Sequence, residues 1–183
     1  MPLQAAMVSV FGATRESRGA RKPNSMTKQT KRPPARVFLV DDHALVREHL
    51  TALLGAEKDL AVCGEAEDAP EALALIRQQE PDLVILDLSL KRSSGFDLLE
   101  GVKSLQPKPV VLVLSMHDSA FYAGRALRAG ALGYITKEDA TTNILRAIRQ
   151  VLNGQVYLSE PMASQIHARS AGAEPVMTGG VRG

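Results

Sequence analysis

From residue 36 to residue 153 the chain alternates short apolar runs with longer stretches in which apolar residues recur every three or four positions. The short runs are typical of strands buried on both faces of a parallel sheet, and the longer stretches of amphipathic helices. The pattern predicts five strands, at 36–40, 60–66, 82–87, 109–115 and 131–136, and five helices, at 41–55, 69–79, 96–105, 119–129 and 139–153. In the first helix, five residues are predicted to share the buried face: Leu45, Val46, Leu50, Leu53 and Leu54.

Each predicted strand leads into a helix through a short turn, so the connections are expected to be right-handed crossovers. The prediction is an α/β fold of the flavodoxin-like type, with a doubly wound five-stranded parallel sheet in the order 2-1-3-4-5 and five helices on its two faces. In that order the first and third strands are neighbours where the winding reverses. Ligands of such sheets bind beyond the carboxyl ends of the strands at this point.

Polar segments at both ends divide the 183-residue chain into three parts. Residues 1–35 predict a disordered basic leader, 36–158 the folded domain, and 159–183 a short helix or linker with a disordered tail. The first 36 residues hold eight Lys or Arg and one acid, so 14 of the 22 basic and 19 of the 20 acidic residues remain for the other 147. The folded part is therefore acidic, and the formal net charge of +2 does not indicate nucleic-acid binding.

The single cysteine, Cys63, excludes an intramolecular disulfide framework or a zinc-thiolate site and favours a reducing compartment. We therefore expect a cytoplasmic protein. No stretch approaches the length of a membrane span. The apolar patch Met7–Phe11 is too short for a secretory signal, and a transit peptide or a native start at Met26 are alternatives for the leader.

Charged and hydroxyl side chains stand at the carboxyl ends of four predicted strands: Asp41 and Asp42, Asp87, Ser115 and Lys137. The three carboxylates are expected to meet where the first and third strands lie side by side. Like charges ~4 Å apart repel by roughly 4 kcal/mol per pair at an effective dielectric near 20, so a positive group is needed there. Carboxylate oxygens suit Mg²⁺ better than Zn²⁺, and Lys137 supplies a second positive charge.

A carboxylate held between a cation and an ammonium predicts phosphoryl transfer, because both positive groups can neutralise charge on the transferred oxygens. Each residue also has an ordinary structural interpretation. Asp42 could cap the first helix, Ser115 could be a loop residue and Lys137 a solvated charge. The prediction therefore depends on the set of residues and not on any single member.

Four segments resemble the receiver domain of two-component response regulators, over about Arg36 to Leu158. FLVDDH resembles the acidic metal-binding turn, LDLSL the phospho-acceptor strand, VLSMHD the segment with the switch Ser or Thr, and GYITKE the strand that bears the lysine. The stretch LSMHDSAFYAGRALRAGALGYITK, followed by NGQVYLS, is similar to receivers that precede a LuxR-type helix-turn-helix.

The resemblance implies the phospho-acceptor and its metal ligands. Asp87 would accept the phosphoryl group. Asp41 and Asp42 would hold Mg²⁺ together with Asp87 and the backbone carbonyl of Ser89.

The resemblance also implies the residues that respond to phosphorylation. Ser115 and Lys137 would bind the phosphoryl group, and Tyr134 would be the aromatic residue that swings inward as Ser115 moves. We further expect Ser89 and His117 to flank the attacking water and to tune the lifetime of the phosphorylated form. A solvated His117 in a turn is the plain alternative.

The sequence departs from the family pattern at a few points. Lys91 stands where the family usually has Pro, whereas Gly95 matches the loop glycine. The 29 residues after Gly154 fall below the ~40 usually needed for an independent domain. No output domain is therefore expected in this tail.

We expect the chain to accept a phosphoryl group from a histidine kinase and to change a partner-binding surface. Its only activities would be its own phosphorylation and dephosphorylation, so it would not be an enzyme in the usual sense. The partner would be an unknown output protein or a second copy in a homodimer, without direct nucleic-acid binding or a membrane.

Three rival functions are weighed against this one. A truncated or divergent DNA-binding transcriptional regulator would share the receiver. An aspartyl-phosphate phosphatase would need a general acid two residues after Asp87, where Ser89 stands. A flavin mononucleotide protein would not carry Asp41 and Asp42 in its phosphate loop.

Overall fold

The computed structural model describes residues 33–171 and contains a five-stranded parallel sheet in the order β2-β1-β3-β4-β5. The strands are β1 (Ala35–Val40), β2 (Leu60–Ala66), β3 (Leu83–Asp87), β4 (Val110–Ser115) and β5 (Gly133–Thr136). The helices are α1 (Ala44–Gly55), α2 (Ala69–Gln79), α3 (Gly95–Val102), α4 (Ala120–Ala129), α5 (Lys137–Leu152) and α6 (Glu160–Ala171). The predicted strand order and the strand–helix alternation are confirmed.

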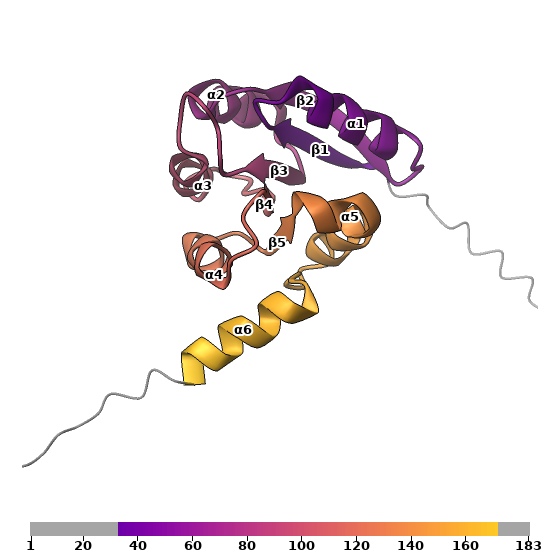
Figure 1. Cartoon of the computed structure of the whole chain (residues 1–183). Coiled ribbons are helices and arrows are strands. Elements are labelled where there is room, and N and C mark those ends of the chain that lie inside the picture. The colour runs from indigo at the N-terminus through magenta and orange to yellow at the C-terminus, as the bar shows by residue number, and fades with distance from the viewer. Residues whose placement is uncertain (1–32, 172–183) are drawn as a thin grey trace, which may run out of the picture. The chain divides into compact units, whose positions relative to one another are not determined.

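Helices cover both faces of the sheet (Figure 1). Side chains alternate along β1, so that Val37 and Leu39 pack with α1 and α5 while Phe38 and Val40 pack with α2, α3 and α4. Successive strand residues point to opposite faces, and both faces are buried, which explains the nearly unbroken apolar runs in the sequence.

The first turn of α1 differs from the prediction. Leu45 was expected on the buried face, and this prediction is wrong because its side chain is 79% exposed. Arg47 takes a buried position instead, on the same stripe as Leu50 and Leu54.

The ends of several helices also differ from the predicted ends, and α1 begins at Ala44 instead of residue 41. The last residues predicted for α3 form a tighter turn, since Lys103 and Leu105 donate backbone hydrogen bonds to residues only three positions earlier. Helix α5 begins at Lys137, directly after β5, because the Thr136 hydroxyl accepts a hydrogen bond from the backbone N–H of Asp139 (3.1 Å).

A sixth helix follows the domain core, where the sequence predicted a short helix or linker. Tyr157 first makes a parallel bridge to Gly133 on the open edge of β5. Helix α6 then packs on α4 (Figure 1), and Met162 is buried in the same cluster as Tyr134. Residues 1–32 of the predicted leader and residues 172–183 of the predicted tail lie outside the described residues, whereas Ala35, predicted as the end of the leader, is the first residue of β1. Within the described part of the chain, no helix has the length and apolar character needed to cross a membrane.

Candidate functional site

The predicted site residues come together at the carboxyl ends of the strands. Asp87, the last residue of β3, pairs with Leu114, one residue before Ser115. Ser115 in turn pairs with Thr136, immediately before Lys137. The parallel register therefore brings residues that are distant in the sequence to one edge of the sheet.

Lys137 bridges two buried carboxylates. Its Nζ donates hydrogen bonds of 2.7 Å to Oδ2 of Asp41 and 2.7 Å to Oδ2 of Asp87, whose side chains are 3% and 1% exposed. Burial alone would lower the pKa of Lys137, but the hydrogen bonds and charges of both aspartates raise it above its ordinary value. The ammonium therefore stays charged and holds Asp41 and Asp87 together.

Asp42 is held by a different lysine. Its Oδ2 accepts a hydrogen bond from the backbone N–H of Lys91 (3.1 Å), and Nζ of Lys91 lies 3.4 Å from the same oxygen. Burial alone would raise the pKa of Asp42, but the hydrogen bonds from Lys91 and the charges of His43 and Lys91 lower it. The carboxylate of Asp42 is therefore ionised at neutral pH.

His43 and Arg47, to which the sequence pattern assigns no role, both contact the site. The backbone N–H of His43 donates to Oδ1 of Asp41 (2.8 Å), and its ring Nδ1 lies 3.0 Å from the same oxygen. Arg47 donates to the backbone carbonyl of Asp41 (2.6 Å) and to Glu67 (2.8 Å). A basic residue three and seven positions before Leu50 and Leu54, on an otherwise apolar stripe, was the signal for a buried Arg47.

Ser115, His117 and Tyr134 form a second group of contacts beside the carboxylates. Oγ of the fully buried Ser115 accepts a hydrogen bond from the backbone N–H of His117 (3.1 Å). The hydroxyl of Tyr134 donates to the carbonyl of His117 (2.6 Å), and the His117 ring stacks on Tyr122 of α4 at 4.5 Å. Burial raises the pKa of Tyr134, so its hydroxyl keeps the proton that it donates.

Gly95 is packed against the site strand. A Cβ atom at this position would lie 2.6 Å from the carbonyl oxygen of Asp87 and 2.6 Å from Cα of Leu88. Both are backbone atoms, so they cannot move aside without moving the end of β3. Only glycine allows α3 to begin this close to Asp87.

Comparison with known proteins decides the family. The model of the response regulator receiver domain matches residues 37–149, which is more than half of the chain. The chain belongs to the response regulator receiver family. A curated relative, the Fimbriae Z protein of Salmonella typhimurium, is 40% identical over 121 residues, which cover 66% of this chain and 58% of that protein. The transcriptional regulatory protein MctR of Rhizobium johnstonii is 38% identical over 130 residues, or 71% of this chain and 61% of MctR.

Solved receiver structures agree in fold. A LuxR-family two-component response regulator from Aurantimonas sp. SI85-9A1 is 34% identical with a TM-score of 0.71, covering 75% of this chain and 99% of that chain. The response regulator domain of Thermotoga maritima CheB is 28% identical with a TM-score of 0.61, covering 66% and 97%. The chain spans about 60% of the length of the curated relatives that it matches.

Receiver domains bind Mg²⁺ at an acidic pocket, and this receiver has residues that fit such an ion. Ligand atoms of Asp41, Asp42, His43 and Asp87 all lie within 4.8 Å of one another. Oδ1 of Asp42 is buried without a hydrogen bond, although Nδ1 of His43 lies 2.9 Å away. A carboxylate oxygen in this position is a suitable ligand for a hard divalent cation. The backbone N–H of Ser89 donates to Oδ1 of Asp87 (2.8 Å), while the predicted role of the Ser89 carbonyl stays a prediction.

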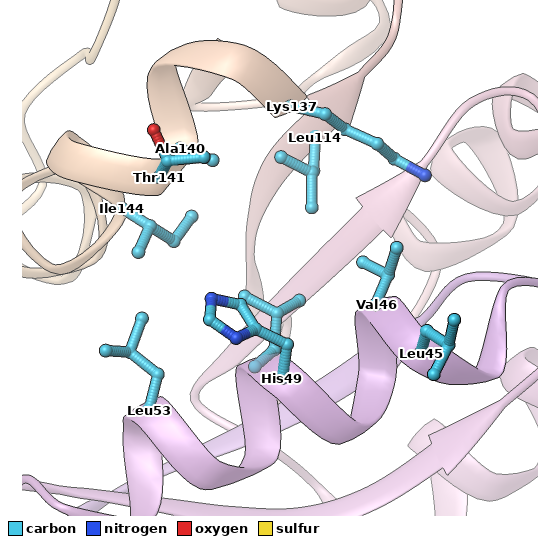
Figure 2. Close-up of a pocket in the computed structure, with 10 residues that line it drawn as sticks. Leu45, Val46, His49, Leu53, Leu114, Lys137, Ala140, Thr141 and Ile144 are labelled. Carbon is cyan, nitrogen blue, oxygen red and sulfur yellow. The ribbon is translucent and has the colours of Figure 1, made fainter.

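A cavity of about 240 Å³ separates α1 from α5 next to this site (Figure 2). Leu53 of α1 lies opposite Ile144 of α5, and Leu45 and Val46 line the end of the groove on the Lys137 side. The exposed Leu45 side chain is thus part of a groove wall. The stem of Lys137 forms part of the groove wall while its ammonium reaches the carboxylates. The apolar wall supports the stem and leaves only the charged end at the site.

Proposed function

We propose that Asp87 is the residue of this receiver that a histidine kinase phosphorylates in a Mg²⁺-dependent reaction. The observation that carries the proposal is the Lys137 ammonium, 2.7 Å from both Asp41 and Asp87, with Asp42 in the same cluster. One carboxylate oxygen of Asp87 would attack phosphorus of the kinase phosphohistidine. An O–P bond forms, the N–P bond breaks, and the imidazole leaves with the bonding electrons and takes up a proton.

The residues around Asp87 prepare it for this reaction. Lys137 holds Oδ2, and the backbone N–H of Ser89 holds Oδ1, so both oxygens have fixed positions before the phosphodonor arrives. Asp41, Asp42 and Asp87 would hold Mg²⁺, which when bound neutralises charge on phosphoryl oxygens. After transfer, Lys137 would pair with the acyl phosphate, a charge-assisted contact.

We propose Ser115 and Tyr134 as the residues that respond to phosphorylation. Ser115 now accepts a hydrogen bond from the backbone N–H of His117, and its hydroxyl, which can also donate, would turn to a phosphoryl oxygen after transfer. A shift of Ser115 would move His117, which contacts both Tyr134 and α4 through Tyr122. The phosphorylated form would thereby favour one arrangement of α4, β5 and α5 over the other.

The proposed partners follow from this mechanism. The histidine kinase is the phosphodonor, and the changed surface of α4, β5 and α5 would bind an output protein or a second copy of the chain, in the cytoplasm. We propose no activity besides self-phosphorylation and autodephosphorylation. Ser89 and His117 would adjust the rate of the latter.

A DNA-binding regulator is the second candidate. It is favoured by one observation, which is that the matched MctR is named a transcriptional regulatory protein and is longer than the matched region. A gel shift of the phosphorylated chain on promoter DNA separates the two candidates. Retarded DNA would support direct binding, and unchanged migration would support action through a protein partner.

The test of the proposed function is adduct formation. Purified protein with Mg²⁺ and acetyl phosphate is expected to give a phosphorylated band on a phosphate-affinity gel, and Asp87→Asn should abolish it. Asp97→Asn is the matched control, because Asp97 is an exposed aspartate in the first turn of α3 and should leave the band unchanged. Absence of a band in the wild type, or its persistence in Asp87→Asn, would contradict the assignment.

A further inference from the structure

Two different lysines form ion pairs with the three clustered aspartates of the site. Lys137 binds Asp41 and Asp87, whereas Asp42 is met by Lys91 from the loop after β3. The two lysines differ in exposure, since the side chain of Lys137 is 14% exposed and that of Lys91 is 68% exposed. Lys137 is held in the site by two hydrogen bonds, whereas most of the Lys91 side chain lies in solvent.

We propose that Lys91 sets the divalent-cation affinity of this receiver by competing with the cation for Asp42. The Lys91 ammonium is a positive charge tethered 3.4 Å from Oδ2 of Asp42. Mg²⁺ bound to the same carboxylate would either displace this ammonium or be repelled by it, and both effects lower the affinity for Mg²⁺. The inference rests on the proposed function, because it takes Asp42 as a metal ligand.

The backbone of Lys91 acts differently from its side chain. Its N–H donates to Oδ2 of Asp42 at 3.1 Å, which fixes the position of the carboxylate and of the loop. A proline at this position has no N–H and could not make this bond. Lys91 therefore combines an amide that positions Asp42 with an ammonium that competes for it, and a test has to remove the second while keeping the first.

The expected effect is moderate. An exposed pair of single charges changes a folding or binding constant by at most about fivefold. The Coulomb repulsion between a lysine and a divalent ion is twice that between a lysine and a monovalent cation at the same distance. We expect Lys91→Gln to bind Mg²⁺ roughly three- to tenfold more tightly than the wild type at low salt. The gain should shrink near 1 M salt, where the screening length is about 3 Å.

The experiment is a calorimetric Mg²⁺ titration of the full chain and three variants. Lys91→Gln removes the side-chain charge and keeps the backbone N–H that bonds to Asp42. Lys91→Arg keeps the side-chain charge and should bind Mg²⁺ with the wild-type affinity. Arg92→Gln removes a neighbouring charge that has no contact with the carboxylates among the described residues. It should change the affinity much less than Lys91→Gln.

Each outcome has a defined meaning. Tighter binding only in Lys91→Gln supports the inference. Equal affinities in the wild type, Lys91→Gln and Arg92→Gln overturn it and leave the proposed function intact, because Mg²⁺ still binds. An equal gain in Lys91→Gln and Arg92→Gln also overturns it, in favour of general surface charge. If neither the wild type nor Lys91→Gln binds Mg²⁺, the inference and the metal-dependent part of the proposed function both fail.

Discussion

Replacing Lys137 by Met should destabilise the domain strongly, and Mg²⁺ should recover part of the loss. Met keeps an apolar stem of similar length but removes the ammonium that bridges Asp41 and Asp87 at 2.7 Å each. The two carboxylates are 3% and 1% exposed, so they would remain buried without a counter-charge. Breaking such a buried pair costs about 3–5 kcal/mol, a large part of the 5–15 kcal/mol that usually stabilises a domain.

Urea unfolding followed by circular dichroism, first in EDTA and then in Mg²⁺, measures this loss. Lys103→Met is the matched control, because Lys103 pairs with Glu100 at the surface and the two side chains are 35% and 61% exposed. The control should lose less than about 1 kcal/mol of unfolding free energy. Mg²⁺ should stabilise the Lys137 variant, since an ion that binds only the folded state adds to its stability. If Lys137→Met loses no more than the control, the ammonium does not hold the buried carboxylates together.

Three further outcomes are expected. Gly95→Ala should lower the free energy of unfolding by roughly 1–3 kcal/mol, measured by urea titration, because its Cβ would meet the backbone of Asp87 at 2.6 Å; an unchanged midpoint would mean that α3 can shift freely. Burial raises the pKa of Tyr134 and Tyr157, so the stability that their neutral phenols contribute is present below about pH 10 and lost as the pH rises further. Absorbance at alkaline pH should show both ionising together with unfolding, and early ionisation of the folded protein would contradict this. His117→Ala should change the rate at which the adduct loses phosphate, because His117 is bonded to Ser115 through its backbone N–H and its ring stacks on Tyr122 of α4; an equal rate would assign the ring a packing role only.

The fold was predictable because its determinants are local and repeated. Apolar runs of strand length, each followed by a helical period, allow few arrangements of a parallel sheet, and the observed order matches the expected one. The meeting of Asp41, Asp87 and Lys137 follows from the same logic, because parallel strands end at one edge. The sequence shows which residues end each strand, and the strand order then places those residues next to one another.

The sequence pattern did not predict the exposure of Leu45 or the burial of Arg47, because both depend on which parts of α1 the rest of the domain covers. The apolar stripe of α1 includes Leu45, but the first turn of the helix faces a groove, and the residue is left 79% exposed. Arg47 is buried because the carbonyl of Asp41 and the carboxylate of Glu67 accept hydrogen bonds from its guanidinium. Such pairings depend on the three-dimensional approach of β1, α1 and the segment after β2, which hydrophobic spacing does not encode.

Tyr134 connects the site to the segment that follows the domain core. Its hydroxyl bonds to the carbonyl of His117 beside Ser115, while its backbone N–H donates to the carbonyl of Tyr157 (2.9 Å). The segment after Tyr157 leads into α6, whose Met162 is buried in the cluster that contains Tyr134. A rearrangement that moves Tyr134 must therefore alter contacts on the α4 side and on the α6 side together. Because both sets of contacts converge on one residue of β5, the same strand that leads into Lys137 also links the site to α6.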